Sequence, residues 1–166
     1  QYLHYVKMLA NAKVNLTDIL DRTMPGIKPL LKSSVRTTGK NKLCDFVEKF
    51  WHCDIITKMS EAKFISEYIK WAKKKGYHPN ETKAKSLYTN ALECIPTLPS
   101  KSPSTKMLVL EAAKAVSNLE RFILQLARKI IPQMYGIFTT KQPLFSKKYT
   151  IFATMEQKLL DTLKKY

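Results

Sequence analysis

The sequence predicts an all-α fold, a single-domain bundle of about five helices. Three observations lead to this prediction. Apolar residues recur at steps of three and four along most of the chain, so they share one face of each helix. No segment alternates between apolar and polar residues over the length of a strand. The chain has 166 residues, 45% of them hydrophobic, which is enough for one core and too few for two.

The first two expected helices lie in the first half of the chain. One runs over residues 2–21 and ends before Pro25, because proline lacks the N–H that a helix needs. The second begins near Lys40 and either continues or restarts at Ser60. Gly76 follows its last turn, where a glycine commonly adopts the left-handed conformation that ends a helix.

A third helix is expected between Asn80 and Pro96. Asparagine is a favoured N-cap residue, and proline ends the apolar pattern. The proline- and serine-rich stretch 96–104 then reads as an extended connector. Because neither side of it is large enough to fold alone, we expect one domain over residues 1–166.

Two further helices are expected after the connector. The first is capped by Ser104, carries the most regular apolar pattern of the chain and ends at Pro132. The last covers residues 150–165.

Between these two helices, the stretch 133–149 holds seven large apolar or aromatic residues without a clear period. It either folds back over the bundle or leaves an exposed patch, which would indicate a protein or membrane contact. Trp71 is expected to lie half-buried at the edge of its helix. The predicted apolar patch consists of Trp71, Met134, Tyr135, Ile137, Phe138, Leu144 and Phe145.

The charge is the unusual feature of the composition. The chain has 29 Lys and Arg against 13 Asp and Glu, a formal net charge of +16. A field of this sign raises the encounter rate with any polyanion and fades as salt rises. We therefore expect a polyanionic partner. The predicted basic contact surface consists of Arg22, Lys28, Lys32, Arg36, Lys63, Lys70, Lys73, Lys74, Lys75, Arg121, Arg128 and Lys129.

The peptide YIKWAKKKGY, residues 68–77, is the densest part of that surface. Lys63, Lys70 and Lys74 are seven and four residues apart, so they share one side of a helix. The simpler interpretation is that these lysines only form a solvated face and complement the dipole near the C-terminus of the helix. The scarcity of acidic residues nearby favours a contact surface.

No motif for chemistry is present. Four glycines are too few and too scattered for a phosphate-binding loop or a dinucleotide fingerprint, and the three histidines are dispersed. We therefore predict no metal site, no cofactor, no small-molecule substrate and no enzymatic activity, and we expect the protein to act by binding.

Three cysteines leave two interpretations open. Cys44 and Cys53 are nine residues apart, so on one helix they point to opposite sides and cannot bridge each other. One of them can pair with Cys94, which leaves a third thiol that is free or joins a second chain in a homodimer. Alternatively, all three are small buried apolar residues.

The sequence favours export. No apolar run approaches the ~20 residues of a membrane span. The sequence begins at Gln1, so we expect a trimmed or mature chain. Asn15 and Asn80 each begin an N-x-T sequon, although both also fit roles in helices, and the sequence does not decide whether either is glycosylated.

Several short motifs occur in order between residues 3 and 135. They are Leu3-His4-Tyr5-Val6; Asp21-Arg22 followed by Lys28, Leu31, Arg36 and Thr37; Tyr68-Ile69 with Trp71, Lys73 and Lys74; Tyr88-Thr89 with Ala91-Leu92-Glu93; and Ile131-Pro132-Gln133-Met134-Tyr135. In this order they resemble motifs of gastropod (abalone) sperm lysin and its acrosomal fertilisation paralogues. The three cysteines and the connector depart from lysin, so the chain resembles the fusagenic paralogue more than lysin itself.

The resemblance implies a secreted protein of the sperm acrosomal vesicle that acts in fertilisation without catalysis. It implies that the protein binds and perturbs the egg plasma membrane, whose lipid is anionic, to promote sperm–egg fusion. One alternative is lysin-like dissolution of the egg vitelline envelope, with Arg22, Lys28, Lys32 and Arg36 on its glycoprotein. Another, from a different class, is a helical nucleic-acid-binding domain, for which no recognised motif is present.

Overall fold

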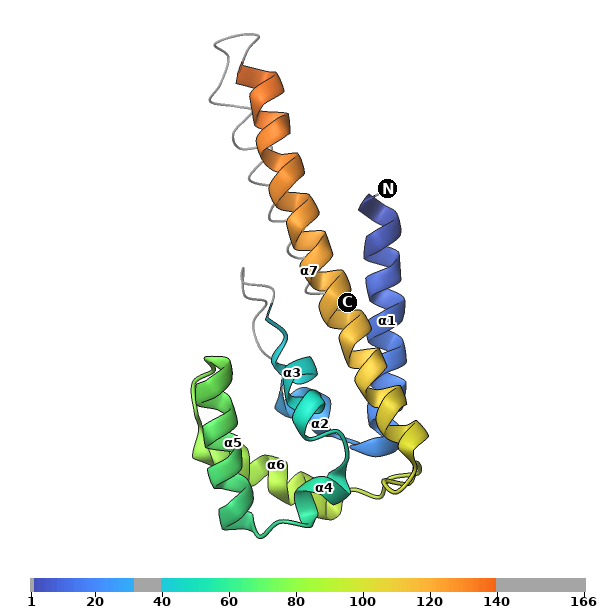
Figure 1. The fold of residues 1–166 in the computed structure, drawn as a ribbon, viewed down its shortest axis with the longest axis vertical. Helices are drawn as coiled ribbons and strands as arrows, with labels where there is room; N and C mark the ends of the chain where they lie inside the picture. The colour runs from blue at the N-terminus through green and yellow to red at the C-terminus, as the bar shows by residue number, and fades with distance from the viewer. Residues whose placement is uncertain (1, 32–39, 140–166) are drawn as a thin grey trace.

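A long helix and its partner form one side of the molecule (Figure 1). The computed structural model describes residues 2–31 and 40–139, and every regular element in that part of the chain is a helix. Helix α1 spans Tyr2–Thr23, α7 spans Pro103–Thr139, and the two lie side by side. The prediction of an all-α fold is confirmed.

The shorter helices gather at one end of this pair, where α7 begins (Figure 1). They are α2 (Ile27–Leu30), α3 (Lys42–Lys49), α4 (Cys53–Thr57), α5 (Glu61–Lys75) and α6 (Glu81–Glu93). The described residues thus form seven helices instead of the five or so expected for the chain. The difference comes from α2, which the sequence pattern did not indicate, and from the division of the segment between Lys40 and Ser60 into α3 and α4. A new helix, α5, begins after Ser60, which is the second of the two expected possibilities.

The core joins residues from both sides of the proline-serine connector. Leu20, Phe46, Tyr68, Leu87 and Val116 come from five different helices, and each is at most 1% exposed. They belong to one hydrophobic cluster. Burial of apolar area of this kind is the main favourable term in folding. The helices at the lower end are thereby packed against the α1–α7 pair.

A polar junction fixes α1, α3 and α7 relative to one another. Lys13 Nζ of α1 lies 3.0 Å from Glu120 Oε1 of α7. The side-chain amide of Asn41 donates to Glu120 Oε2 at 3.0 Å. Its oxygen also caps α3 by accepting from the Cys44 amide at 3.2 Å. One carboxylate therefore connects three helices.

The connector is held by backbone hydrogen bonds. The amides of Thr97 and Leu98 both donate to the carbonyl of Arg22, at 2.9 and 3.1 Å. The Leu98 carbonyl in turn accepts from His52 Nε2 at 2.9 Å. This irregular segment is thus bound to the end of α1 and the start of α4.

The break between α3 and α4 corrects the expectation that the helix begun near Lys40 runs at least to Ser60. Phe50, Trp51 and His52 are 2%, 8% and 0% exposed. On a continuous helix that turns about 100° per residue, these three side chains would spread over about 200° of its circumference. The chain leaves the helix at Phe50, and the ring of His52 caps α4 by accepting from the Asp54 amide at 3.0 Å.

Helix α7 begins and ends at residues other than the expected ones. Pro103 is its first residue, where the missing N–H costs nothing. Ser104 therefore lies in the first turn and not at the cap. The expected end at Pro132 is wrong, because α7 continues to Thr139. A proline removes one helical hydrogen bond, but the helix can continue when the turns on both sides remain formed.

The expected apolar patch is consequently not placed by the structure. The side chains of Met134, Tyr135, Ile137 and Phe138 belong to the part of α7 whose side chains are not described. Leu144, Phe145 and the helix expected at residues 150–165 also lie outside the described residues.

Two glycines with left-handed backbone give a matched test of the fold. Gly26 has φ 78° and Gly76, which caps α5 as expected, has φ 75°. A Cβ at Gly26 would lie 2.5 Å from Asn90 Oδ1, whereas at Gly76 the nearest atom is Lys40 Nζ at 3.4 Å. We expect Gly76→Ala to cost about 1 kcal/mol and Gly26→Ala about 2 kcal/mol or more, because only Gly26→Ala adds a clash to the backbone strain.

Urea unfolding followed by circular dichroism measures both costs. The side chain of Asn90 is held by a hydrogen bond from its Nδ2 to the Pro25 carbonyl at 2.9 Å, so it cannot move away without loss. Equal costs for the two alanine variants would contradict the close approach at Gly26.

Candidate polyanion-binding surface

Helix α5 separates its aromatic and cationic residues onto different sides. Phe64, Tyr68, Trp71 and Ala72 form its buried side. The exposed lysines are Lys63, Lys70, Lys73 and Lys74. We call these four the α5 lysine face. The expected separation of a buried stripe from a row of lysines is therefore present.

The lysines of α5 differ in how they are paired. Lys75 Nζ lies 2.8 Å from Asp45 Oδ1 and 3.2 Å from Glu48 Oε2, both on α3. The hydrogen bond to Asp45 is the main cause that raises the pKa of Lys75. Lys75 thus ties α5 to α3 and does not belong to the free face.

Lys70 is only loosely paired. It lies 3.6 Å from Glu67 and its side chain is 72% exposed. Glu67 makes a shorter contact, 2.8 Å, with Lys49 of α3. The hydrogen bond from Lys49 is the main cause that lowers the pKa of Glu67. The charge of Glu67 is therefore engaged mainly by Lys49, and Lys70 remains available to an external anion.

Lys63, Lys73 and Lys74 have no ion pair with a described side chain. Within residues 2–31 and 40–129, none of the ion pairs includes these three lysines. Lys73 and Lys74 also lie in the last turn of α5, next to its capping residue Gly76. An ammonium group there complements the negative end of the helix dipole. The face nevertheless keeps its net positive charge towards solvent.

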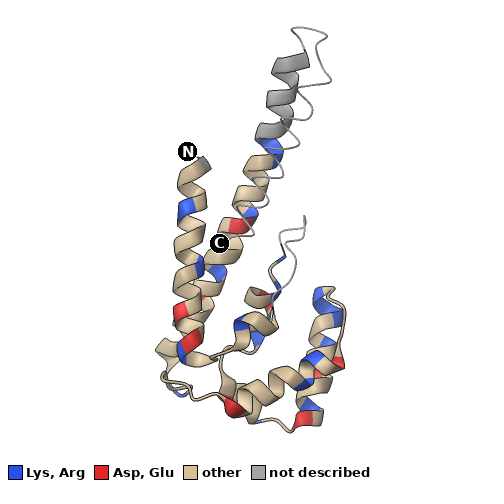
Figure 2. Cartoon of the chain, turned by 180° about the vertical axis from the view of Figure 1, so that it is seen from behind, with Lys and Arg blue, Asp and Glu red and all other residues tan. Residues whose placement is uncertain are grey.

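The other predicted cations do not join this face. Arg22, Lys28, Arg121, Arg128 and Lys129 are exposed, but they lie on α1, α2 and α7. In Figure 2 the basic residues of α5 stand apart from those of α1 and α7. The described members of the predicted basic contact surface thus lie on different helices, and their contact with a partner stays a prediction. Lys32 and Arg36 lie outside the described residues.

Trp71 is buried, which corrects its place in the predicted apolar patch. It is 5% exposed. Its ring contacts Phe46 edge to face at 5.6 Å and stacks on Tyr77 at 5.5 Å. Helix α3 packs against α5 on one side of the indole, and Tyr77 covers it where the chain turns back after Gly76. On an isolated helix α5 this ring would be exposed.

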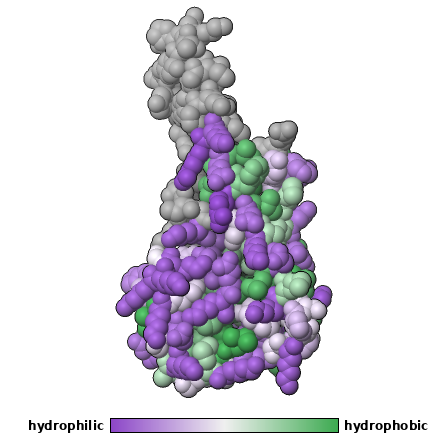
Figure 3. Space-filling model, in the orientation of Figure 1, coloured by the Kyte–Doolittle hydropathy of each residue, from purple (hydrophilic) through white to green (hydrophobic). Residues whose placement is uncertain are grey.

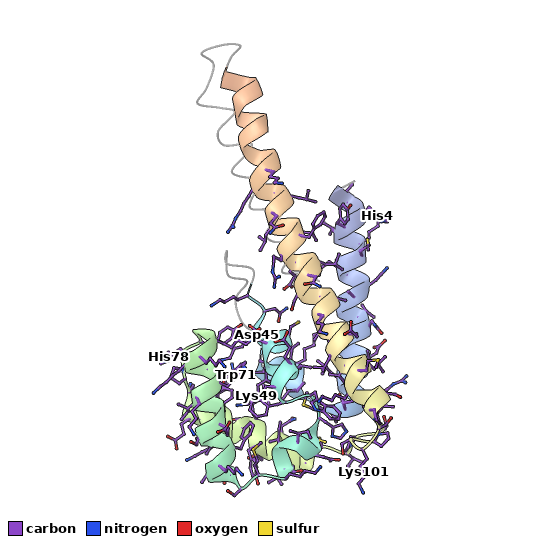
Figure 4. The ribbon with its side chains drawn as sticks, viewed as in Figure 1. His4, Asp45, Lys49, Trp71, His78 and Lys101 are labelled. Atoms are coloured by element: carbon purple, nitrogen blue, oxygen red, sulfur yellow. The ribbon has the colours of Figure 1, made fainter. Side chains whose placement is uncertain are left out.

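A hollow of about 430 Å³ lies beside this indole. Trp71, Asp45 and Lys49 point into the space between α3 and α5 (Figure 4). Trp71 Nε1 is buried and has no hydrogen-bond partner among the described residues. The residues that line the hollow are Asp45, Glu48, Lys49, Lys70, Trp71, Lys74 and Lys75. The hollow is therefore lined by the indole, by two carboxylates that pair with Lys75, and by Lys70 and Lys74 of the α5 lysine face.

Exposed apolar residues are scattered over the described surface. Leu3, Val14, Ile95 and Met107 are 74%, 61%, 85% and 66% exposed, and they come from α1, the connector and α7. Figure 3 shows small apolar groups separated by hydrophilic side chains on the face that it presents. Among the described helices, none has a stretch long and apolar enough to span a bilayer.

His52, Cys53 and Asp54 place possible metal-ligand atoms within 4.8 Å of one another. However, both ring nitrogens of His52 already have partners. Nδ1 accepts from the Asp54 amide at 3.0 Å, so Nε2 carries the proton that it donates to the Leu98 carbonyl. A carboxylate oxygen of Asp54 accepts from Ser100. These contacts assign the group to the cap of α4 and to the attachment of the connector.

The three cysteines are free thiols in two separate places. Cys44 is buried beside Ser117 and Glu120 of α7, and burial is the main cause that raises its pKa to about 12. The Cys94 side chain lies near enough to Cys53 to raise the pKa of its thiol. The expectation that Cys44 and Cys53 share one helix is wrong, because α3 ends before Cys53.

Sequence reasoning missed the contribution of α3 to this surface. Asp45, Glu48 and Lys49 lie on α3 and contact α5. The sequence around α3 does not show that the two helices are neighbours. The spacing of Asp45 and Glu48, three residues apart, indicates only that they share one face of a helix. Comparison with known proteins finds no family model, curated protein or solved structure that matches the chain.

Proposed function

We propose that this chain is a secreted protein of the sperm acrosomal vesicle that acts in fertilisation by binding and perturbing the egg membrane. It acts without catalysis, as a cationic protein that is first drawn to an anionic surface. The observation that carries the proposal is the α5 lysine face, where Lys63, Lys73 and Lys74 have no acidic neighbour within ion-pair distance among the described side chains. The ordered resemblance to acrosomal proteins supplies the biological context.

Electrostatic capture is the first step. Each lysine near an anionic bilayer contributes about 1 kcal/mol, and the attraction decays within a Debye length of about 8 Å at physiological salt. The α5 lysine face presents its charges on one side of one rigid helix, so they can approach a flat surface together. The formal net charge of +16 adds a long-range attraction that depends on ionic strength.

Perturbation of the lipid is the second step. Apolar side chains that enter the interface disturb lipid packing, and they bind in proportion to the apolar area they bury. The candidates are the predicted patch at residues 134–145 and exposed residues such as Leu3 and Met107, which are 74% and 66% exposed. Electrostatic capture brings these groups to the bilayer and raises their local concentration there.

The test uses vesicles with and without anionic lipid. We expect binding, leakage and lipid mixing with phosphatidylserine-containing vesicles at low salt, and the loss of all three at high salt or with phosphatidylcholine alone. A folded protein, checked by circular dichroism, that leaves anionic vesicles intact at low salt would remove the membrane proposal.

A second candidate function is binding of an acidic glycoprotein of the egg coat. The hollow beside Trp71 favours it, because a concave site with an aromatic wall and lysines at its rim suits a discrete acidic sugar better than a flat bilayer. Isolated envelopes should then dissolve at stoichiometric doses, and dissolution at catalytic doses would contradict it. Preference for duplex DNA over heparin would instead favour the nucleic-acid alternative.

A further inference from the structure

Cys53 and Cys94 meet where α4 packs against α6. Cys53 is the first residue of α4, and Cys94 follows the last residue of α6 as its C-cap. The two helices are in contact, and Cys94 packs against the core cluster that contains Cys53, near enough to act on its thiol. The pair lies far apart in the sequence, so the fold and not chain proximity brings the sulfur atoms together.

Cys44 is not available to either of them. Its neighbours are Ser117 and Glu120 on α7 and Lys13 on α1, so it lies at the junction of α1, α3 and α7. A disulfide requires Cα atoms within about 7 Å and side chains that point towards each other. The residues around Cys44 come from α1 and α7. Cys53 and Cys94, in contrast, lie on α4 and at the end of α6, which pack against each other.

We propose that Cys53 and Cys94 form an intramolecular disulfide and that Cys44 remains a free buried thiol. This decides between the two pairings that the sequence left open, and it does not depend on the proposed function. The bond joins the start of α4 to the end of α6 and closes a loop that contains all of α5. The helix with the lysine face thereby becomes part of a covalently closed unit.

The oxidant is a disulfide of the glutathione class, and the reaction is two exchange steps. The thiolate of Cys94, which is the more exposed of the pair, attacks one sulfur of oxidised glutathione and releases one glutathione thiolate. The thiolate of Cys53 then attacks the Cys94 sulfur of the mixed disulfide and releases the second glutathione. The protein loses two electrons and two protons, and one oxidised glutathione becomes two reduced ones.

The second step should be the slow one. Burial, followed by the neighbouring Cys94, raises the pKa of Cys53 well above its ordinary value, so little thiolate is present near neutral pH. The folded pair should therefore oxidise faster as the pH rises. Once formed, a bond that closes a long loop restricts mainly the unfolded chain and stabilises the fold.

The experiment maps disulfides in the full chain. The folded protein is oxidised with oxidised glutathione, its remaining thiols are alkylated in denaturant without reductant, and peptides are analysed by mass spectrometry. We expect a linked Cys53–Cys94 peptide pair, alkylated Cys44 and an intact mass lower by two hydrogens before alkylation. Oxidation should raise the melting temperature by about 10 °C, and dithiothreitol should reverse the rise.

Two variants act as matched controls. Cys44→Ser should keep the linked peptide and the rise in melting temperature. Cys94→Ser should fold, because Cys94 is half-buried and accepts a polar hydroxyl more easily than the buried Cys53 does. It should lose both the linked peptide and the rise in melting temperature. A link through Cys44, a link between two chains, or three alkylated cysteines after oxidation of the folded protein would each overturn the proposal.

Discussion

Replacing Phe46 with alanine is expected to lower the free energy of unfolding by about 4 kcal/mol, which is typical of a buried phenylalanine. Phe46 is fully buried in α3. Its ring lies 4.9 Å from that of Phe50, 6.3 Å from Tyr68 and 5.6 Å from Trp71. The substitution leaves a cavity at the centre of the α3–α5 contact, and urea unfolding followed by circular dichroism measures the loss.

Phe122→Ala is the matched control for this substitution. Phe122 is 39% exposed on α7, and its ring contacts Tyr5 at 4.7 Å. Because less of its surface is removed from water, we expect a loss of about 1–2 kcal/mol. Phe46→Leu should fall between the wild type and Phe46→Ala. Equal losses for Phe46→Ala and Phe122→Ala would show that the aromatic cluster is not the main packing element of the lower end.

Changing all four residues of the α5 lysine face to glutamine is expected to weaken binding to anionic vesicles about 1,000-fold at low salt. The change removes Lys63, Lys70, Lys73 and Lys74, at about 1 kcal/mol each. All four side chains are exposed, so the fold should be retained. Co-sedimentation with phosphatidylserine vesicles over a range of salt concentrations measures the effect, and the salt dependence should become shallower.

A second quadruple variant with the same change in net charge is the control. Lys7, Lys101, Lys106 and Lys114 are exposed and lie on α1, the connector and α7. Their replacement by glutamine lowers the formal charge by the same amount, but it leaves the α5 lysine face intact. We expect a much smaller loss of binding. Equal losses for the two variants would mean that net charge alone attracts the protein and that α5 is not the contact surface.

The parts of the fold that depend on neighbouring residues were predictable from the sequence. Asn80 caps α6 by accepting from the Lys83 amide at 2.9 Å, and Gly76 ends α5 in the left-handed conformation. The lysine row on α5 follows from its seven- and four-residue spacing. Capping and periodicity act within one or two turns, so a single sequence contains their whole cause.

The parts that depend on packing between helices were not predictable. Trp71 lies at the edge of the apolar stripe of α5, and it is buried because Phe46 of α3 and Tyr77, just beyond α5, pack against its ring. The helix break at Phe50–His52 allows three consecutive rings to enter one core, a requirement set by neighbouring helices. Pro132 is a helix breaker by propensity, yet α7 passes through it. For Trp71 and for the break at Phe50–His52, contacts with other helices decide the outcome, and a single sequence does not show them.

The hydrogen bonds of Arg22, Leu98 and His52 also bear on the order in which the molecule is assembled. They join the end of the first helix to residues in the middle of the chain before α7 begins. Contacts between such distant segments require the closure of long loops, and this slows the search for the native topology. The contacts of the connector with α1 and α4 are therefore among the long-range contacts that folding has to form.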